Sequence, residues 1–375
     1  MLPKLFATAF PPVYRLLAIN LVALVCATEV SDFYARSFFL ISLLVTFAGT
    51  AVSSQSYVVS RVVSLARRVG LTAILLLIFA PLFRPLWPEG INSYVIVVVA
   101  AFGASLFEVL RADLAVKGRF AALVVQGVAA SLSLFLIVPI LKDSPWLLCV
   151  LISWVLPISA ILMPGNSIVG EDRVTCVVVK DVASYSLSSG VSTGLSFALP
   201  VLIAGDLGSG APTELAQIMT VTSMFLLYPR FLSTGFMVDL QRCQTREMVD
   251  RYEKRNSSYL FAVVGVYLAV SILVLPELQR YALFAIATVA TQMALPFSNV
   301  HSVLARGHDL LSVNLRALAV LVALIAGAYM LFDPGMYRAQ CVMAVYLAYV
   351  ILRNYLTKKS CLRLLSARPV ACQVE

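Results

Sequence analysis

The chain has 375 residues, of which 61% are hydrophobic and only 13% are charged, and its net charge is +9. That charged share is about half the ~25% of an ordinary soluble domain, and a soluble fold needs more polar cover for its surface than this composition supplies. The totals therefore exclude a water-soluble globular protein and predict an all-α integral membrane protein, because helices satisfy their backbone hydrogen bonds without water.

Apolar runs of about the length that crosses a bilayer recur along the chain. They predict about twelve transmembrane helices, at residues 10–28, 38–59, 69–86, 91–110, 120–140, 146–163, 182–204, 215–238, 258–275, 281–303, 311–332 and 336–356. A polar stretch divides these runs six and six. We expect a six-helix lobe at 1–164, a cytoplasmic linker at 165–181, a second six-helix lobe at 182–357 and a cytoplasmic tail at 358–375.

The basic residues predict the orientation of the chain. With the N-terminus in the cytoplasm, 21 of the 28 lysines and arginines fall in cytoplasmic segments and five fall outside. Positive charge collects in the cytoplasmic loops of membrane proteins, so both termini are predicted to be cytoplasmic, and the net charge needs no nucleic-acid partner. The longest cytoplasmic connection, 239–257, carries oppositely charged residues four apart and predicts a solvated linker helix.

Three arginines lie in or beside apolar runs, where a charge is costly and indicates function. Arg230 lies in the eighth run, Arg15 in the first, and Arg36 at the outer mouth of the second, whereas no acidic residue falls in the middle of a run and Glu108 comes nearest. Cations without carboxylate partners favour a cavity that receives an anionic group such as phosphate. The missing carboxylate argues against antiport of cationic drugs.

The alternative for these arginines is that their long side chains reach the lipid headgroups. For Arg15 and Arg36 this alternative stays open, and Arg230 can also lie at the cytoplasmic interface if the eighth span is displaced along the sequence. We nevertheless take Arg230, Arg15 and Arg36 as candidate anion-binding residues.

Small hydroxylated residues crowd the seventh run, where Gly190 and Gly194 form a G-x-x-x-G pair. The pattern predicts either close helix packing through small residues or a hydroxyl-lined wall suited to sugar or phosphate. Amides in the tenth run are explained most simply by interhelical hydrogen bonds. The candidate sugar-binding residues are Ser186, Ser189, Thr193, Gln292 and Asn299.

The sequence lacks the common catalytic patterns. It contains no phosphate-binding G-x-x-x-x-G-K-[ST] loop, no G-x-S-x-G elbow and no H-E-x-x-H pair. Its cysteines and histidines do not have the spacing of a metal site. We therefore expect a protein that is not an enzyme and that needs neither a cofactor nor a metal.

Three segments resemble Wzx-type polysaccharide flippases of the MOP superfamily. Residues 30–63, "VSDFYARSFFLISLLVTFAGTAVSSQSYVVSRVV", are similar to that family's first loop and second helix. Residues 201–236, "VLIAGDLGSGAPTELAQIMTVTSMFLLYPRFLSTGF", resemble its seventh-to-eighth helix passage with the loop aspartate, here Asp206. Residues 298–320, "SNVHSVLARGHDLLSVNLRALAV", resemble its tenth-to-eleventh connection with an Arg-Gly turn.

The resemblance implies a MATE-like fold of two lobes around a cationic cavity. It also implies a function: translocation of an undecaprenyl-diphosphate-linked oligosaccharide across the bacterial inner membrane, for surface polysaccharide, O-antigen or lipopolysaccharide synthesis. Arg15, Arg36 and Arg230 would be counterparts of the cavity cations by location. The implied partners are the lipid-linked oligosaccharide, the bilayer and other membrane proteins of polysaccharide assembly.

Two other functions stay open. A major-facilitator-type carrier of a small anionic solute also has six plus six helices, but its second-to-third loop usually carries an aspartate that "SRVVSLARRVG" lacks. A membrane polymerase or glycosyltransferase of the same pathway usually needs a sizeable outer loop or a catalytic carboxylate at the membrane surface, and the sequence shows neither.

The arginine pattern generates a first prediction. Replacing Arg230 with Ala or Glu should stop surface polysaccharide export without loss of folded protein, because the diphosphate would lose its cation. Export is measured in cells that depend on this chain, and the amount of folded protein is measured alongside. Unchanged export in both variants would remove Arg230 from the mechanism.

Overall fold

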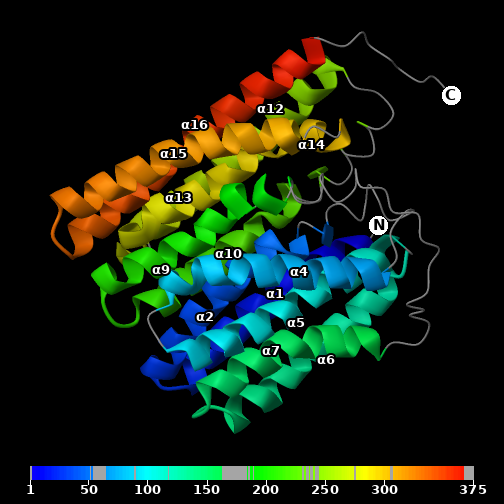
Figure 1. The fold of residues 1–375 in the computed structure, drawn as a ribbon, viewed down its shortest axis with the longest axis vertical. Helices are drawn as coiled ribbons and strands as arrows, with labels where there is room; N and C mark the ends of the chain where they lie inside the picture. The colour runs from blue at the N-terminus through cyan, green and yellow to red at the C-terminus, as the bar shows by residue number, and fades with distance from the viewer. Residues whose placement is uncertain are drawn as a thin grey trace. The chain divides into compact units, whose positions relative to one another are not determined.

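A computed structural model describes the chain at residues 2–50, 52–53, 65–87, 90–116, 118–162, 184, 186–188, 190–229, 232–233, 236, 240, 245–273, 276–304 and 307–366. Over these residues every regular element is helical (Figure 1). The chain divides into two compact units, Met1–Thr220 and Val221–Glu375. The predicted lobe boundaries at 164 and 182 stay a prediction.

Unit 1 is built from helices whose bounds follow the apolar runs. These are α1 (Leu2–Val25), α2 (Thr28–Phe47), α4 (Leu65–Phe83), η1 (Arg84–Leu86), α5 (Ile91–Val116), α6 (Phe120–Ile140), α7 (Pro145–Ile161), η2 (Gly190–Gly194), α9 (Leu195–Leu207) and α10 (Ala211–Phe225), whose last turn crosses into unit 2.

Unit 2 contains the remaining described helices. They are α12 (Arg246–Leu273), η3 (Pro276–Tyr281), α13 (Ala282–Ala290), η4 (Thr291–Ala294), α14 (Leu295–Val303), α15 (Gly307–Leu331) and α16 (Met336–Ser366).

The predicted fold class is confirmed. Each of the twelve apolar runs overlaps a described helix, and within the described residues nine helices are long and apolar enough to cross a membrane. Two shorter apolar helices, Phe10–Val25 and Pro145–Ile161, add to these nine. The chain is therefore a multi-pass, all-α membrane protein, while the cytoplasmic placement of its termini stays a prediction.

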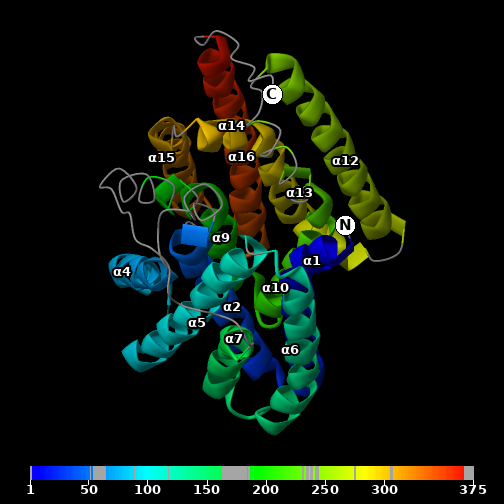
Figure 2. The same ribbon diagram turned by 90° about the vertical axis from the view of Figure 1, so that its right-hand side faces the viewer.

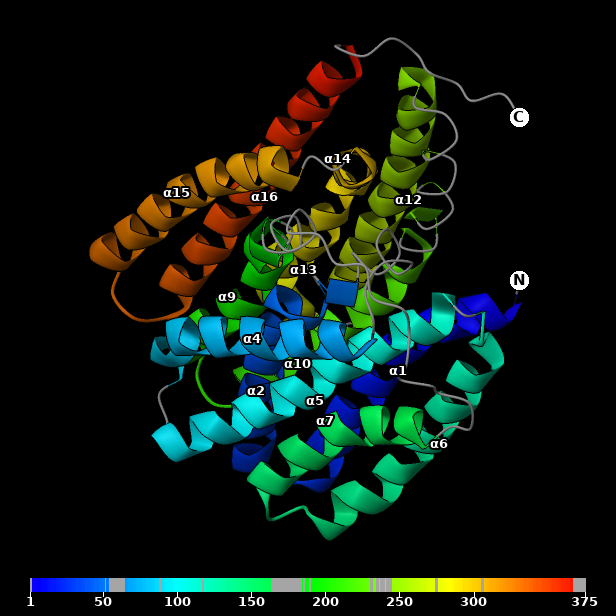
Figure 3. The same cartoon turned by 45° about the vertical axis from the view of Figure 1, so that its right-hand side comes forward.

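The helix α2 lies at the centre of unit 1. Sixteen of its 20 residues are buried, and it packs against α1, α4, α5, α7, η2 and α9. By contrast α6 is a peripheral helix with only a third of its span buried, and it lies alongside α1 (Figure 3). This central position explains why α2 also contributes many of the polar groups described below.

The sequence prediction placed the start of the second helix ten residues too late. The helix begins at Thr28 and not at residue 38, because the polar residues of its first turns are buried against neighbouring helices instead of lying in a loop. Ser31, for example, is buried and its hydroxyl donates to the carbonyl of Val22 at 3.1 Å. Hydropathy alone cannot detect a helix start whose polar residues are satisfied by tertiary contacts.

The seventh span contains a π-helical turn at Gly190–Gly194 before it continues as α9. Both glycines face α2, where a Cβ atom on Gly190 would collide with the Phe47 ring and one on Gly194 would lie 2.9 Å from Leu43 Cδ1. Ser186 donates a hydrogen bond to the carbonyl of Phe47. The close-packing interpretation of the G-x-x-x-G pair therefore holds on this face.

In unit 2, α15 and α16 run side by side as a hairpin, and α16 also contacts α13 and α14 (Figure 2). The expected solvated linker helix is partly wrong. Its described part belongs to α12, one continuous helix of 28 residues, and one face of it is buried. Val249 has no exposed surface and packs in a cluster with residues such as Phe297 and Cys361.

The packing of Gly49, two residues after the end of α2, on α5 generates a second prediction. A Cβ atom at Gly49 would lie 2.7 Å from Ser105 Cα, a backbone atom that cannot rotate away. Gly49→Ala should therefore lower the thermal unfolding midpoint in detergent, with a free-energy loss of about 1–3 kcal/mol from overpacking.

The matched control is Gly70→Ala on α4, where the new Cβ atom meets nothing within 4 Å. This variant should unfold at or above the wild-type midpoint, because alanine favours a helix. Equal midpoints for Gly49→Ala and the wild-type protein would contradict the close approach of Gly49 and α5.

Candidate functional site

The predicted site residues belong to both units. Arg15, Arg36, Ser186 and Thr193 lie in unit 1, whereas Gln292 and Asn299 lie in unit 2. Arg230 and Ser189 lie outside the described residues. The anion-binding and sugar-binding assignments of all eight residues stay predictions.

Arg15 lines a recess inside unit 1. The recess encloses about 50 Å³, which is room for a few water molecules at most. Its wall is formed by Pro11, Tyr14, Arg15, Tyr34, Phe38, Ile41, Ser42, Val45, Ala104, Phe107, Ile152, Ser153 and Leu156. Most of these lining side chains are apolar, and Arg15 is the cation among them. The Arg15 side chain keeps 34% of its surface exposed.

The expectation that Arg15 has no carboxylate partner is wrong. Glu108 Oε1 lies 3.5 Å from the Arg15 guanidinium, and Glu108 Oε2 lies 2.6 Å from Arg111 Nη2. Glu108 lies on α5, eight residues before its end at Val116, and is buried, and the packing of α1 brings Arg15 to it. Among the described residues, one carboxylate is thus shared by two guanidinium groups.

Arg36 lies deeper than predicted. Because α2 begins at Thr28, Arg36 is eight residues, or about 12 Å, inside the helix and not at its mouth. Its Nε atom is buried and has no hydrogen-bond partner among the described residues. Arg36 does not line the Arg15 recess, since it lies about 200° around α2 from the lining residue Tyr34.

Three carboxylates are buried among the described residues of unit 1, although none was predicted in the middle of a span. Asp32, Glu108 and Asp113 are each less than 9% exposed. Asp113 pairs with buried Arg68 at 2.6 Å. Each carboxylate has a donor or cation beside it, which agrees with the rule that buried charges are partnered.

Asp32 joins α2 to the beginning of α10. Its two oxygens accept hydrogen bonds from the backbone N–H of Gly210 at 2.8 Å and from the hydroxyl of Thr213 at 2.7 Å. An acidic group suits this position, because the N-terminal end of a helix presents free N–H groups and partial positive charge. Asp32 therefore fixes the first turn of α10 against α2.

The hydroxyls of the seventh span mostly bond within the protein. Ser186 has no exposed surface and donates to the Phe47 carbonyl. Thr193 is half-buried in the π-helical turn, 3.5 Å from the Ser192 hydroxyl. Packing therefore explains Ser186, and Thr193 keeps some exposed surface.

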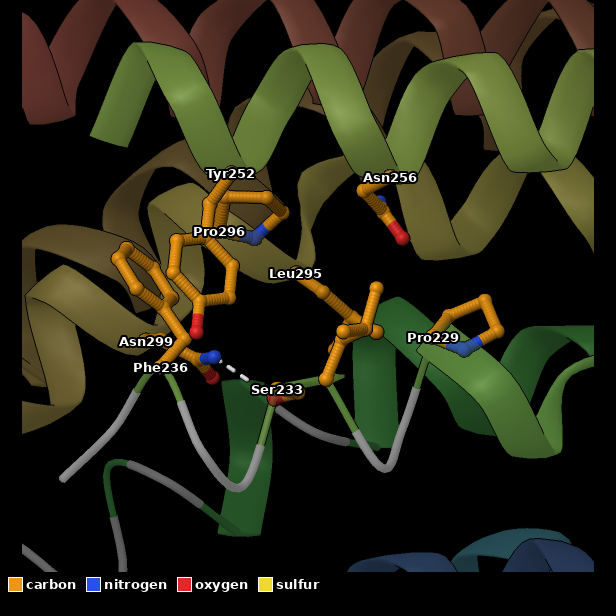
Figure 4. Close-up of a pocket in the computed structure, with 9 residues that line it drawn as sticks. Pro229, Ser233, Phe236, Tyr252, Asn256, Leu295, Pro296 and Asn299 are labelled. Atoms are coloured by element: carbon orange, nitrogen blue, oxygen red, sulfur yellow. Dashed lines mark hydrogen bonds between the residues drawn. The ribbon is translucent and has the colours of Figure 1, made fainter. Parts of the chain in front are cut away.

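The two candidate amides of unit 2 lie close to a small pocket of about 10 Å³, enough for roughly one water molecule. Asn299 lines it and donates to the Ser233 hydroxyl at 2.7 Å, and Asn256 faces it from α12 (Figure 4). The Asn256 side-chain amide donates to the backbone carbonyl of Gln292 at 2.9 Å. The Gln292 side chain donates to the Thr291 hydroxyl. Long-range hydrogen bonding therefore describes the Asn299 side chain, whereas the Gln292 side chain bonds within η4.

Sequence reasoning missed a buried cation in unit 2. Arg353 is only 4% exposed and donates to the Thr291 carbonyl at 2.8 Å and to Asn354 at 3.0 Å. Arg353 is one of the 21 basic residues predicted to be cytoplasmic, although it lies within the apolar run 336–356. That position inside the run was the signal, and the continuation of α16 to Ser366 explains it.

The described residues offer little to a metal ion. Within them, no three side chains of His, Cys, Asp or Glu lie close enough to hold one. What the arrangement in unit 1 can do chemically is attract an anion, at the exposed side of Arg15 and at Arg36.

Comparison with known proteins places the fold. No family model and no curated protein matches the sequence. Solved structures do match over nearly the whole chain. An outward-facing multidrug resistance MATE family transporter of the MOP superfamily has a TM-score of 0.60 at 12% identity, covering 98% of this chain and 95% of that chain.

Two further structures agree. An inward-facing multidrug resistance MATE family transporter of the MOP superfamily has a TM-score of 0.58 at 14% identity, with 97% of this chain and 96% of that chain covered. A MATE transporter from Vibrio cholerae has a TM-score of 0.55 at 11% identity, with 98% and 95% covered. The protein is therefore a multi-pass membrane protein with the fold of MATE transporters of the MOP superfamily.

The Glu108 cluster generates a third prediction. Replacing Glu108 with Gln removes the negative charge beside Arg15 while keeping the side-chain size, so purified protein should bind inorganic pyrophosphate several-fold more tightly. Binding is measured by isothermal titration calorimetry at low ionic strength.

The control is Glu247→Gln, which removes one negative charge from an exposed position on α12. It should leave pyrophosphate affinity within about twofold of wild type, because exposed charges are screened. Weaker or unchanged binding by folded Glu108→Gln protein would show that Arg15 does not receive anions.

Proposed function

We propose that the protein is a flippase, which moves an undecaprenyl-diphosphate-linked oligosaccharide across the bacterial inner membrane for surface polysaccharide synthesis. The observation that carries this proposal is Arg36, a cation well inside a membrane helix whose Nε atom has no partner among the described residues. The MATE fold supports it as well, because it is a transporter fold in the structures that match.

Arg36 carries a positive charge well inside a membrane helix. A guanidinium group at membrane depth is stable only with a counter-charge, hydrogen-bond acceptors or water around it. The described residues place no carboxylate within ion-pair distance of it. A diphosphate supplies several charged oxygens, and planar guanidinium groups bind phosphate oxygens in pairs. An anionic substrate would therefore complete the coordination of Arg36.

Arg15 adds a second contact of the same kind. It shares Glu108 with Arg111, so that carboxylate is divided between two cations, and its exposed side can face an anion. The recess beside it is too small for a sugar ring. We therefore assign Arg15 a separate phosphate contact, on a different face of α2 from Arg36, and place the glycan elsewhere.

The other candidate functions receive less support. The major-facilitator alternative depended on the six-plus-six layout, and the matching structures have the MATE fold instead. Export of a cationic drug would need an available anion, and Asp32, Glu108 and Asp113 are all engaged by donors or cations within unit 1. A membrane enzyme stays the least favoured alternative.

The fourth prediction tests the flippase directly. Purified protein is reconstituted into vesicles with a fluorescent undecaprenyl-diphosphate chitobiose, and transfer between leaflets is followed by chemical quenching. Arg36→Gln should lower the transfer rate about tenfold or more, because one charge-assisted contact is worth roughly 1.5–3 kcal/mol. Arg36→Lys should keep part of the activity, since it keeps the charge.

Arg316→Gln, at an exposed position on α15, is the matched control and should transfer the lipid at close to the wild-type rate. Wild-type vesicles no faster than protein-free vesicles would refute the proposed function. Equal rates for Arg36→Gln and wild type would refute the role of Arg36 in it.

A further inference from the structure

An amide pair in unit 1 has surroundings unlike those of the other polar groups in its helices. The side-chain amide of Gln217 on α10 donates to the Asn20 carbonyl oxygen on α1 at 3.1 Å, and the Asn20 amide donates to the Leu16 backbone carbonyl at 2.8 Å. Asn20 is exposed and Gln217 is half-buried. The pair therefore lies on the surface of the unit.

The pair is also well inside the helices. Asn20 precedes the end of α1 at Val25 by five residues, and Gln217 follows the start of α10 at Ala211 by six. At 1.5 Å per residue these positions lie about 8–9 Å from their helix ends. Both residues fall within apolar runs, so a surface at this depth faces either lipid chains or water that enters the protein.

The unused hydrogen-bonding groups of the two amides indicate whether this surface faces lipid or water. Each amide has two N–H donors and an acceptor oxygen. No hydrogen bond within the described residues engages the Gln217 Oε1 atom or the second N–H of either side chain. Leaving such groups in hydrocarbon costs about several kcal/mol. The exposed amides therefore indicate a surface that is wetted.

A comparison with two other amides of the chain supports this reading. Gln126 on α6 is 1% exposed and donates to the Leu156 carbonyl at 2.6 Å. Asn256 on α12 is 4% exposed and donates to the Gln292 carbonyl. Both of these packing amides are buried, whereas Asn20 is exposed.

The neighbouring contact holds the pair in place. Thr213, one helical turn before Gln217 on α10, donates to Asp32 on α2, and Asp32 also binds the Gly210 N–H. This anchor fixes the start of α10 and thereby sets Gln217 opposite Asn20. A preorganised pair loses less conformational entropy when it binds a ligand.

We propose that Asn20 and Gln217 bind hydroxyl groups of the glycan on the transported lipid. The proposal rests on the proposed flippase function and assigns the sugar contact to residues outside the predicted set. Neighbouring hydroxyls of a sugar both donate and accept, so they match the free N–H groups and the free carbonyl oxygen of the pair. The amides carry no charge and do not compete for the diphosphate.

The first experiment tests whether the surface is wet. Asn20→Cys and Gln217→Cys proteins, with the native cysteines left in place, are treated in vesicles with a membrane-impermeant maleimide applied to both faces. Modification at residues 20 and 217 is read by peptide mass spectrometry. Labelling should be about tenfold or more faster than at the control Val125→Cys, because maleimide reacts with the thiolate, which forms in water.

Val125 is a suitable control because it is 64% exposed on the peripheral helix α6, where an apolar side chain faces lipid. Labelling at residues 20 and 217 no faster than at residue 125 would overturn the proposal.

The second experiment tests for sugar. Undecaprenyl-diphosphate chitobiose should slow the labelling of residues 20 and 217 several-fold, whereas undecaprenyl diphosphate without sugar should not. In the transport assay, Asn20→Leu and Gln217→Leu should reduce transfer of the sugar-bearing lipid more than transfer of the bare lipid. Asn92→Leu, at an exposed amide on α5, should change neither.

Equal protection by the two lipids, or equal loss of their transfer, would overturn the sugar assignment. The outcome is separable from that of the flippase proposal. If wild-type protein moves neither lipid, but residues 20 and 217 of the Cys variants are labelled and are protected only by the sugar-bearing lipid, the binding site stands and the transport is refuted.

Discussion

A lipid bilayer offers no hydrogen-bond partners in its hydrocarbon core, and this constraint explains where the polar residues of the protein lie. The Gln126 amide donates to a carbonyl of a neighbouring helix, and the Arg68 guanidinium pairs with Asp113. These groups are satisfied within the protein. Arg36 and Asn20 are not fully satisfied by the described residues, and so they point to water or a substrate.

The central helix α2 connects this constraint to the proposed function. Its buried first turns hold Asp32, which fixes α10, and its next turn holds Arg36. Another face of the same helix lines the Arg15 recess through residues such as Tyr34 and Ser42. Helix packing and candidate substrate contacts therefore depend on the same element, and changes that loosen α2 should affect both stability and transport.

The balance of charge in unit 1 also bears on the choice of substrate. The sequence suggested cations without anions, whereas the structure shows clusters in which buried carboxylates are shared or capped. Among the described residues, positive charge at Arg15 and Arg36 still exceeds negative charge, but by less than the sequence implied. This local excess is the feature on which the proposed anionic substrate depends.

The sequence by itself determined that the chain is a multi-pass helical membrane protein, because apolar length and the absence of water in lipid leave no other solution. It also located some helices closely, with identical bounds for α6 at 120–140. It did not place the start of α2, the Arg15–Glu108 pair or the exposure of Asn20. Only the tertiary structure decided these, because each depends on which side chain of a distant helix lies opposite, and hydropathy along one segment carries no information about that.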